Sequence, residues 1–273
     1  MQRRHAPIIA DGPDLCDLGQ DSLMSKNLKY ALVTGASSGI GAATARAMAT
    51  AGYQVIAAAR RADRLAELAS DQIEARILDV TSQQSVDELA AYLSDKNLEV
   101  IVTNAGGAFD ANTIVEADLD TWQKTYEVNV IGAVRTIKAL VPRMSEGGHV
   151  VIMGSTAGRG VYEGGGSYTA AKHAVAAMAE TLRLELNGLP IRVTEIAPGM
   201  VHSDEFAVVR FGGDKERAAK VYEGVAEPLV PEDIADAVVW CVTRPAHVNV
   251  DLLVVRPVAQ AASHKVHRII PPK

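Results

Sequence analysis

The chain of 273 residues is 48% hydrophobic, which suits one large α/β core, and no linker-like stretch divides it. Its 27 basic and 33 acidic residues give a net charge of −6, which argues against nucleic acid as a partner because DNA and RNA attract positive surfaces. The apolar runs fall well short of the roughly 18 residues that span a bilayer, and Cys16 and Cys241 lack the spacing of a disulfide framework or a zinc cluster, so we expect a soluble, cytoplasmic protein without a membrane partner.

Residues 1–27 begin basic and then turn polar and acidic, without the uninterrupted apolar segment of a signal peptide. We expect a flexible N-terminal extension there, followed by one domain over 28–273. A start at Met24, just before the first predicted strand, is the alternative explanation of this segment.

Short β-rich runs alternate with longer helical stretches from residue 28 onward. The runs are almost continuously apolar, which indicates strands that are buried on both faces. The pattern predicts an α/β fold: a single doubly wound Rossmann domain with a seven-stranded, mostly parallel sheet and helices on both faces. The strands are predicted at 29–34, 53–59, 73–79, 98–103, 148–154, 191–197 and 251–255.

Crossover helices are predicted between these strands, over 39–52, 61–70 and 166–187. A further helix begins in "SQQSVDELAAYLSD", with Thr81 as its predicted N-cap. The apolar spacing of residues 120–145 predicts one helix of about seven turns. The least regular segment, residues 199–231 (the lid), is predicted to cover the substrate.

Three glycines, Gly35, Gly39 and Gly41, stand where the first strand turns into the first helix in "ALVTGASSGIGAA". Glycine lets the backbone approach a pyrophosphate, which then faces the N-terminus of the helix. The spacing differs from the G-x-G-x-x-G of the general dinucleotide-binding motif. We interpret the turn as a phosphate site, with a purely structural role of the glycines as the alternative.

The end of the second predicted strand indicates which dinucleotide is bound. In folds of this kind, a carboxylate about 20 residues past the glycine turn holds the ribose 2′-hydroxyl of NAD. Here that place falls at Ala59, and Arg60 and Arg61 follow it. A guanidinium binds a 2′-phosphate, whereas a carboxylate would repel it. NADP is therefore the predicted cofactor, and solvation of the next helix is the alternative role of the arginines.

Five separated motifs resemble the short-chain dehydrogenase/reductase family over essentially the whole chain from residue 28. They are "TGASSGIG" at 34–41, "LDV" at 78–80, "TNAG" at 103–106, "YEVNVIG" around Asn129, and "GSTAGRGVYEGGGSYTAAK" together with "APGMVHS". Each motif is weak alone, but their joint occurrence in this order is specific. The resemblance implies a homotetramer, with the tail "HKVHRIIPPK" near an interface.

The resemblance also implies a set of cofactor-binding residues. Asp79 and Val80 would bracket the adenine, and Val201 and Ser203 would hold the carboxamide, although the family more often has threonine where Ser203 stands. The whole implied set is Gly35, Ser37, Ser38, Gly39, Ile40, Gly41, Arg60, Arg61, Asp79, Val80, Asn104, Ala105, Gly106, Tyr168, Lys172, Pro198, Gly199, Val201 and Ser203.

Tyr168 and Lys172 are four residues apart in "GSYTAAKHAV" and are therefore neighbours on one helix face. An ammonium beside a phenol favours the phenolate and should lower its pKa from the ordinary value of about 10. The pair can thus act as an acid and a base. Packing of the tyrosine ring on the lysine stem is the structural alternative.

Ser155 decides between these interpretations because it follows the fifth strand, at the sheet edge where doubly wound folds bind ligands. By resemblance, Ser155 holds the substrate oxygen, Tyr168 transfers the proton and Lys172 also contacts the nicotinamide ribose. Asn129 resembles the residue that anchors a water linked to Lys172. An asparagine that bends a helix with its hydrogen bonds satisfied is the alternative role of Asn129.

The last third of the chain resembles a narrower group, the NADP-dependent 3-hydroxy acid dehydrogenases, in "IRVTEIAPGMV", "DEFAVVRFGGDKERAAKVYEG", "PLVPEDIADAVVW" and "RPAHVNVDLLVVRPVAQ". This implies a small-molecule substrate such as serine, L-allo-threonine or 3-hydroxypropionate, or the reduction of malonic semialdehyde. The carboxylate of such a substrate needs a cation. Arg159 and Arg210 are the candidates, and Arg210 is preferred.

Two other functions stay open from the sequence: a broad carbonyl or 3-oxoacyl reductase, and an NADP-binding regulatory protein without turnover. The joint presence of Asn129, Ser155, Tyr168 and Lys172 argues against the second. His173 and His202 have no further ligand at a suitable spacing, so no metal site is predicted.

Overall fold

A computed structural model describes residues 28–144, 146–203 and 205–269 of the chain. The predicted extension over residues 1–27, with Cys16, lies outside the described residues. None of the helices in the described ranges is both long and apolar enough to cross a membrane.

Seven strands form one sheet in the order β3-β2-β1-β4-β5-β6-β7, and each neighbouring pair is parallel. Each strand lies within two residues of its predicted bounds, so the predicted Rossmann sheet is confirmed, with every pairing parallel. The strands are β1 (Tyr30–Thr34), β2 (Gln54–Ala59), β3 (Ile73–Ile77), β4 (Leu98–Thr103), β5 (His149–Met153), β6 (Arg192–Pro198) and β7 (Leu252–Val255).

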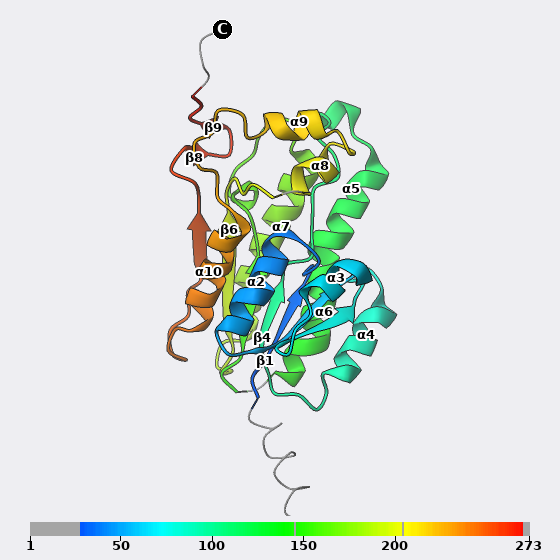
Figure 1. Cartoon of the computed structure of the whole chain (residues 1–273), viewed down its shortest axis with the longest axis vertical. Coiled ribbons are helices and arrows are strands. Elements are labelled where there is room, and N and C mark those ends of the chain that lie inside the picture. Colours follow the sequence, from blue (N-terminus) through cyan, green and yellow to red (C-terminus); the bar gives the residue numbers. More distant parts are fainter. Residues whose placement is uncertain (1–27, 145, 204, 270–273) are drawn as a thin grey trace, which may run out of the picture.

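Helices cover both faces of the sheet because successive strand side chains point to opposite sides (Figure 1). Ala31 and Val33 of β1 pack with α2 (Gly39–Thr50), α3 (Ala62–Leu68) and α10 (Pro231–Val242). Leu32, between them in sequence, packs on the other face. The helices of that face are α4 (Gln83–Tyr92), α6 (Gly132–Leu140) and α7 (Gly166–Glu185).

The predicted N-cap of α4 is wrong by one residue. The Thr81 hydroxyl donates to the Oδ1 atom of Asp79 at 2.7 Å, so it faces back toward the strand end. Ser82 caps the helix instead, because its Oγ atom accepts from the Ser85 backbone N–H at 3.3 Å.

The predicted helix over 120–145 is confirmed in extent up to Arg143, but it is not a uniform α-helix. The segment is divided into α5 (Leu119–Tyr126), a π-helical turn η2 (Glu127–Ile131), α6 and the 3₁₀ turn η3 (Val141–Arg143). Asn129 lies in the π turn, and its amide Nδ2 donates to the Thr125 carbonyl at 2.8 Å. A side chain that bonds the backbone of the preceding turn widens the helix locally.

The lid contains two short helices, α8 (Phe206–Arg210) and α9 (Lys215–Lys220), which lie next to each other in Figure 1. Two other 3₁₀ turns, η1 (Ile114–Glu116) and η4 (Thr156–Gly158), flank the site described below. After β7, the chain forms an antiparallel pair that no sequence pattern indicated, β8 (Gln260–Ala262) with β9 (Lys265–Val266). The Ile269 backbone N–H donates to the Gly224 carbonyl at 2.7 Å, so the C-terminal segment contacts the lid.

Candidate active site

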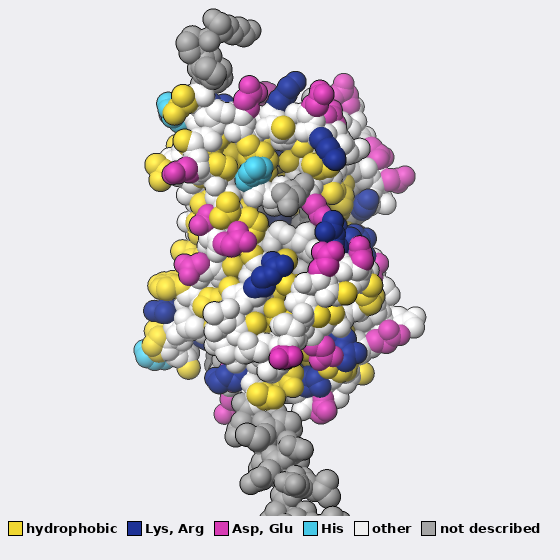
Figure 2. Space-filling view, in the orientation of Figure 1, with side chains coloured by type: hydrophobic (Ala, Val, Ile, Leu, Met, Phe, Trp, Pro, Cys, Tyr) yellow, Lys and Arg dark blue, Asp and Glu magenta, His cyan; other side chains and the backbone are white. Residues whose placement is uncertain are grey.

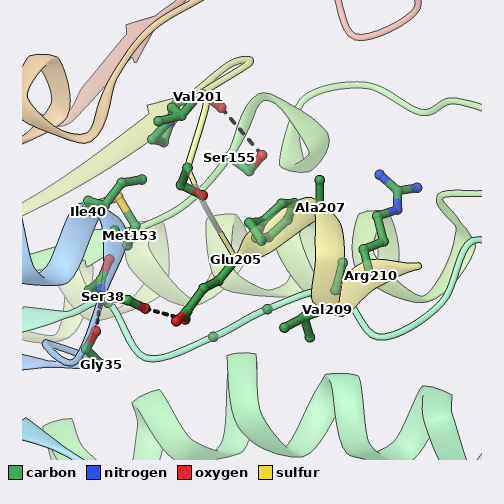
Figure 3. Close-up of a pocket in the computed structure, with 18 of the residues that line it drawn as sticks. Gly35, Ser38, Ile40, Met153, Ser155, Val201, Glu205, Ala207, Val209 and Arg210 are labelled. Carbon is green, nitrogen blue, oxygen red and sulfur yellow. Dashed lines mark hydrogen bonds between the residues drawn. The ribbon is translucent and has the colours of Figure 1, made fainter. Parts of the chain in front are cut away.

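A cavity of about 1460 Å³ lies along the carboxyl ends of the parallel strands, between these ends and the lid (Figure 3). This is the edge at which open α/β sheets bind ligands, because the loops after the strands meet there. Almost all of the residues predicted to bind the cofactor or the substrate line it. They are Gly35, Ser37, Ser38, Gly39, Ile40, Gly41, Arg60, Arg61, Asp79, Val80, Asn104, Ala105, Gly106, Ser155, Tyr168, Lys172, Pro198, Gly199, Val201, Ser203 and Arg210.

The glycine turn presents bare backbone to this cavity. Gly35 and Gly39 have φ angles of +67° and +52°, which only glycine adopts readily. A Cβ atom on Gly41 would lie 2.3 Å from the Gly35 carbonyl oxygen and 2.5 Å from the Asn104 amide nitrogen. The turn is thus packed so closely that no side chain can enter it, and this cradle fits the pyrophosphate of a dinucleotide.

Thr34 joins the ends of two central strands under the turn. Its hydroxyl oxygen accepts hydrogen bonds from the backbone N–H groups of Asn104 and Ala105, both at 3.0 Å. The Asn104 side chain in turn donates to the Thr34 carbonyl at 3.0 Å. These bonds fix the loops after β1 and β4 against each other, so the cradle has a rigid floor.

A basic end of the cavity follows β2. Arg60 and Arg61 both line the cavity, and Arg61 donates to the Ser37 hydroxyl through its Nε and Nη2 atoms, at 3.2 and 2.9 Å. Burial works to raise the pKa of Asp79, but hydrogen bonds from Thr81 and the nearby Arg60 outweigh it and lower that pKa. Two guanidinium groups and a serine hydroxyl fit a 2′-phosphate, and β2 ends in Ala59, where a protein that binds NAD would have a carboxylate.

Ser155 and Tyr168 meet inside the cavity. Ser155 lies two residues after β5 and is the N-cap of η4. Its Oγ atom accepts a hydrogen bond from the Ala157 backbone N–H at 3.1 Å. Tyr168 lies in the first turn of α7 and is only 9% exposed. Burial raises the pKa of the Tyr168 phenol well above its usual value, and the Ser155 hydroxyl opposes part of this shift.

Lys172 lies one helical turn beyond Tyr168 and is almost completely buried. Its Nζ atom donates to the Met153 carbonyl at 2.8 Å and lies 5.7 Å from the centre of the Tyr168 ring. Burial lowers the pKa of Lys172 to about 8, although Glu195 acts in the opposite direction. The predicted lowering of the Tyr168 pKa by Lys172 is wrong for this arrangement, because burial dominates and the ammonium faces the Met153 carbonyl.

Asn129 does not line the cavity. Its amide Nδ2 donates to the carbonyls of Gly107 and Thr125, both at 2.8 Å, and its Oδ1 accepts from the Gly107 backbone N–H at 3.2 Å. This geometry agrees with the alternative of a helix-bending asparagine whose hydrogen bonds are satisfied. The water-anchoring role of Asn129 stays a prediction.

The two arginines that were candidates for a substrate carboxylate have different surroundings. Arg159 forms ion pairs with the buried Glu195 and, at 3.2 Å, with Glu180, and it is not part of the cavity lining. Arg210 lines the cavity from the end of α8. Its Nη1 donates to the Tyr162 hydroxyl at 3.2 Å and its Nη2 to the Gly164 carbonyl at 2.9 Å. The cavity therefore contains the preferred candidate of the pair and leaves the other outside.

The two histidines near the site contact neighbouring protein groups. The His173 Nδ1 atom lies 2.8 Å from the Thr169 carbonyl, and the His202 ring lies 4.3 Å from the Tyr222 ring, centre to centre. Within the part of the chain that the structure describes, no three His, Cys, Asp or Glu side chains come together as a metal site.

Comparisons with known proteins agree with this geometry. The sequence matches the short chain dehydrogenase family over residues 29–210. An uncharacterized oxidoreductase of Mycobacterium tuberculosis (strain H37Rv) is 48% identical over 241 residues, which cover 87% of this chain and 94% of that protein. The NADP-dependent 3-hydroxy acid dehydrogenase YdfG of Escherichia coli (strain K12) is 39% identical over 245 residues, which cover 87% of this chain and 98% of that protein.

A solved structure described as the closed form of serine dehydrogenase complexed with NADP+ has a TM-score of 0.82 to this chain. It is 38% identical, and the match covers 88% of this chain and 100% of the other. The chain belongs to the short-chain dehydrogenase family. The resemblance to NADP-dependent 3-hydroxy acid dehydrogenases found in the sequence is likewise confirmed.

Several cavity residues of this short-chain dehydrogenase were not predicted from its sequence. The Phe206 ring lies 5.6 Å from the Tyr168 ring in an edge-to-face arrangement. Gln260, from the unpredicted β8, accepts a hydrogen bond from the Met200 backbone N–H at 2.8 Å and so supports the start of the lid. Both residues lie in stretches that resemble the 3-hydroxy acid dehydrogenases, but nothing in those stretches marked either one as a cavity residue. Only the folded chain brings them to the cavity.

Glu205 is the most consequential of the residues that were missed. Its carboxylate lies against Ser38 and Arg61, at the basic end of the cavity (Figure 3). The sequence signals for it are its position two residues after "APGMVHS" and its place in the stretch "DEFAVVRFGGDKERAAKVYEG". A surface carboxylate at the start of a short helix is common, so this signal is weak.

Proposed function

We propose that the protein is an NADP-dependent oxidoreductase that catalyses reversible hydride transfer between NADP(H) and a short 3-hydroxy acid or its 3-oxo counterpart. The observation that carries the proposal is that Ser155, Tyr168 and Lys172 line the same cavity as the glycine turn and the arginine pair. The names of the relatives supply the reaction class. The homotetramer and the cytoplasmic location stay predictions.

NADP, when bound, accepts or donates the hydride. The glycine turn would receive its pyrophosphate, and Arg60, Arg61 and Ser37 would receive its 2′-phosphate. Lys172 would bond the nicotinamide ribose by turning its ammonium from the Met153 carbonyl. Each assignment uses a donor or a backbone opening that already lines the cavity.

Tyr168 would move the proton at its hydroxyl oxygen. In the reductive direction the phenol gives a proton to the carbonyl oxygen of the substrate while Ser155 donates a hydrogen bond to that oxygen. In the oxidative direction the transfer of the proton and that of the hydride reverse, and the proton of the substrate hydroxyl moves to the Tyr168 oxygen. The raised pKa of Tyr168 keeps the unliganded site in the protonated form that reduction needs.

Arg210 would bind the substrate carboxylate. It already donates to neutral oxygen acceptors at Tyr162 and Gly164, and a guanidinium has further N–H groups with which to bind an acid. Its positive charge also acts to lower the pKa of Tyr168, and both residues line the same cavity.

The decisive experiment measures the formation of reduced nicotinamide from NADP+ with L-serine, L-allo-threonine and 3-hydroxypropionate. Tyr168→Phe should lower kcat by about 10²–10⁴-fold, the usual contribution of a positioned acid or base, and leave NADP+ affinity almost unchanged. Tyr126→Phe, which removes a phenolic hydroxyl on the exposed side of α5, is the control and should have no effect.

The outcome separates the alternatives. Turnover of bulky ketones without turnover of 3-hydroxy acids would indicate a broad carbonyl reductase. Tight NADP+ binding without turnover of any substrate would indicate a regulatory protein. Normal activity of Tyr168→Phe would refute the assigned proton donor.

A further inference from the structure

A carboxylate of the lid lies on the arginine that is available for a 2′-phosphate. Glu205 Oε1 lies 2.8 Å from Arg61 Nη1, and Glu205 Oε2 lies 2.8 Å from Arg61 Nη2. Two parallel charge-assisted bonds of this kind form the preferred geometry between a guanidinium and a planar anion. On the face shown in Figure 2, basic and acidic side chains gather beside one another over α3.

The hydroxyls of the glycine turn complete the contact. Ser38 Oγ donates to Glu205 Oε2 at 2.8 Å, drawn as a dashed line in Figure 3. Ser38 is the N-cap of α2, yet its side chain makes no capping hydrogen bond. Arg61 Nη2 also donates to Ser37 Oγ and Ser38 Oγ, both at 2.9 Å. The same guanidinium and hydroxyls that suit a phosphate are therefore occupied by a carboxylate of the chain itself.

The hydrogen bond from Arg61 lowers the pKa of Glu205 against the opposing effect of burial, so the carboxylate is ionised at neutral pH. The Arg61 and Glu205 side chains are 43% and 34% exposed, which means that water reaches the ion pair. Partly exposed pairs contribute little to stability, so a stronger anion can displace this one. A 2′-phosphate carries a larger charge, about −1.5 to −2 near pH 7, than a carboxylate.

We propose that Glu205 is a specificity-determining residue for the cofactor: it occupies the 2′-phosphate site as an internal anion, and a 2′-phosphorylated nucleotide binds by displacing it from Arg61 and Ser38. The inference rests on the proposed use of NADP. Because Glu205 belongs to the lid, each 2′-phosphate that binds also releases one of the bonds that hold the lid to the glycine turn.

Calorimetric titration of the full chain at low ionic strength tests this. The ligand pairs are 2′,5′-ADP with 5′-AMP, and NADP+ with NAD+, since the members of each pair differ only in the 2′-phosphate. Glu205→Gln should tighten the binding of 2′,5′-ADP and NADP+ by about threefold to tenfold, the range expected for removing an exposed competing charge, and leave 5′-AMP and NAD+ unchanged. Glu67→Gln, an acidic residue of the same cavity wall that bonds Arg64, is the matched control.

A second background makes the test specific to the Arg61 contact. In Arg61→Gln, the substitution Glu205→Gln should change the affinity for 2′,5′-ADP by less than about twofold, because the group for which both anions compete is gone. Thermal unfolding of each variant checks that it is folded. Equal tightening of 5′-AMP and 2′,5′-ADP, or weaker binding of 2′,5′-ADP by Glu205→Gln, would overturn the proposal.

The wild-type titrations separate this inference from the proposed function. If the unchanged chain binds 2′,5′-ADP no better than 5′-AMP, the assignment of NADP fails and the inference fails with it. If the unchanged chain prefers 2′,5′-ADP but Glu205→Gln has the affinities of the unchanged chain, only the role of Glu205 is refuted.

Discussion

The two walls of the cavity are built differently. The strand-end wall follows β1 to β6, and its residues are fixed by close backbone packing and by hydrogen bonds such as those of Thr34. In the lid, α8 and α9 bury one residue each, Ala207 and Ala218. Binding of the common cofactor thus depends on the rigid wall. We expect substrate choice to depend, as the Glu205 contact does, on a segment with little buried surface, which can move at low energetic cost.

The largest expected effect comes from adding one methyl group to a glycine in each wall. In Gly41→Ala, the new Cβ atom would overlap the Gly35 carbonyl oxygen at 2.3 Å. We expect a loss of about 3–5 kcal/mol in the free energy of unfolding, because backbone on both sides of the turn must shift. Calorimetric titration should also show that NADP+ binding is lost.

Gly212→Ala is the matched substitution in the lid. A Cβ atom there has no neighbour within 4 Å, and only the φ angle of +64° opposes it. The expected loss is about 1–2 kcal/mol, with NADP+ affinity retained. Equal losses in both variants, measured by urea denaturation, would refute the contrast between the walls.

A smaller test concerns the charge that the rigid wall buries. Lys172 has a pKa of about 8 in the folded chain against an ordinary value of 10.5. Below pH 8 both states are protonated and the folded state bears the full cost of the buried ammonium. Between pH 8 and 10.5 the folded state loses its proton first, so this cost disappears. Lys172→Met removes this cost. Its effect on the free energy of unfolding should therefore be about 3 kcal/mol more stabilising at pH 7 than at pH 10.5, since each pKa unit corresponds to about 1.36 kcal/mol.

Lys215→Met, on the exposed surface of α9 in the lid, provides the comparison. Its effect on the free energy of unfolding should be small at both pH 7 and pH 10.5, because this side chain is exposed and its removal frees no buried charge. If the difference between wild type and Lys172→Met did not shrink as the pH rises through 8, the burial assigned to Lys172 would be wrong. Denaturant titrations of both variants and of the wild type, at pH values from 7 to 10.5, measure these differences.

The sequence predicts the strand-end wall better than the lid. The strands were found within two residues because runs such as "ALVT" and "VIAAA" are apolar on both faces. The glycine turn was found because three glycines stand between the first strand and the first helix. Motifs of this kind encode backbone geometry that any member of the family needs. They therefore placed the cofactor cradle, Ser155, Tyr168 and Lys172 at one cavity.

The errors have a common physical cause, which is competition between local groups. The π turn depends on the Asn129 amide reaching Thr125 and Gly107, and the N-cap of α4 depends on Asp79 taking the Thr81 hydroxyl. The pKa of Tyr168 depends on burial, which a spacing of four residues does not reveal. Glu205 and Ser38 are 167 positions apart, so nothing local links them.

The smallest expected effect concerns backbone strain in the lid. Among the described residues, Glu227 is the one residue other than glycine with a positive φ angle, +50°. Its side chain is exposed, so Glu227→Gly removes no buried contact. Relief of the left-handed strain should exceed the extra entropy that glycine gives the unfolded chain, and raise the free energy of unfolding by about 0.5–1 kcal/mol.

Glu223→Gly is the control, at an exposed lid position without a positive φ angle. It should lower the free energy of unfolding, because only the entropic cost remains. Destabilisation by both substitutions in urea denaturation would mean that the left-handed backbone at Glu227 carries no strain that glycine can relieve.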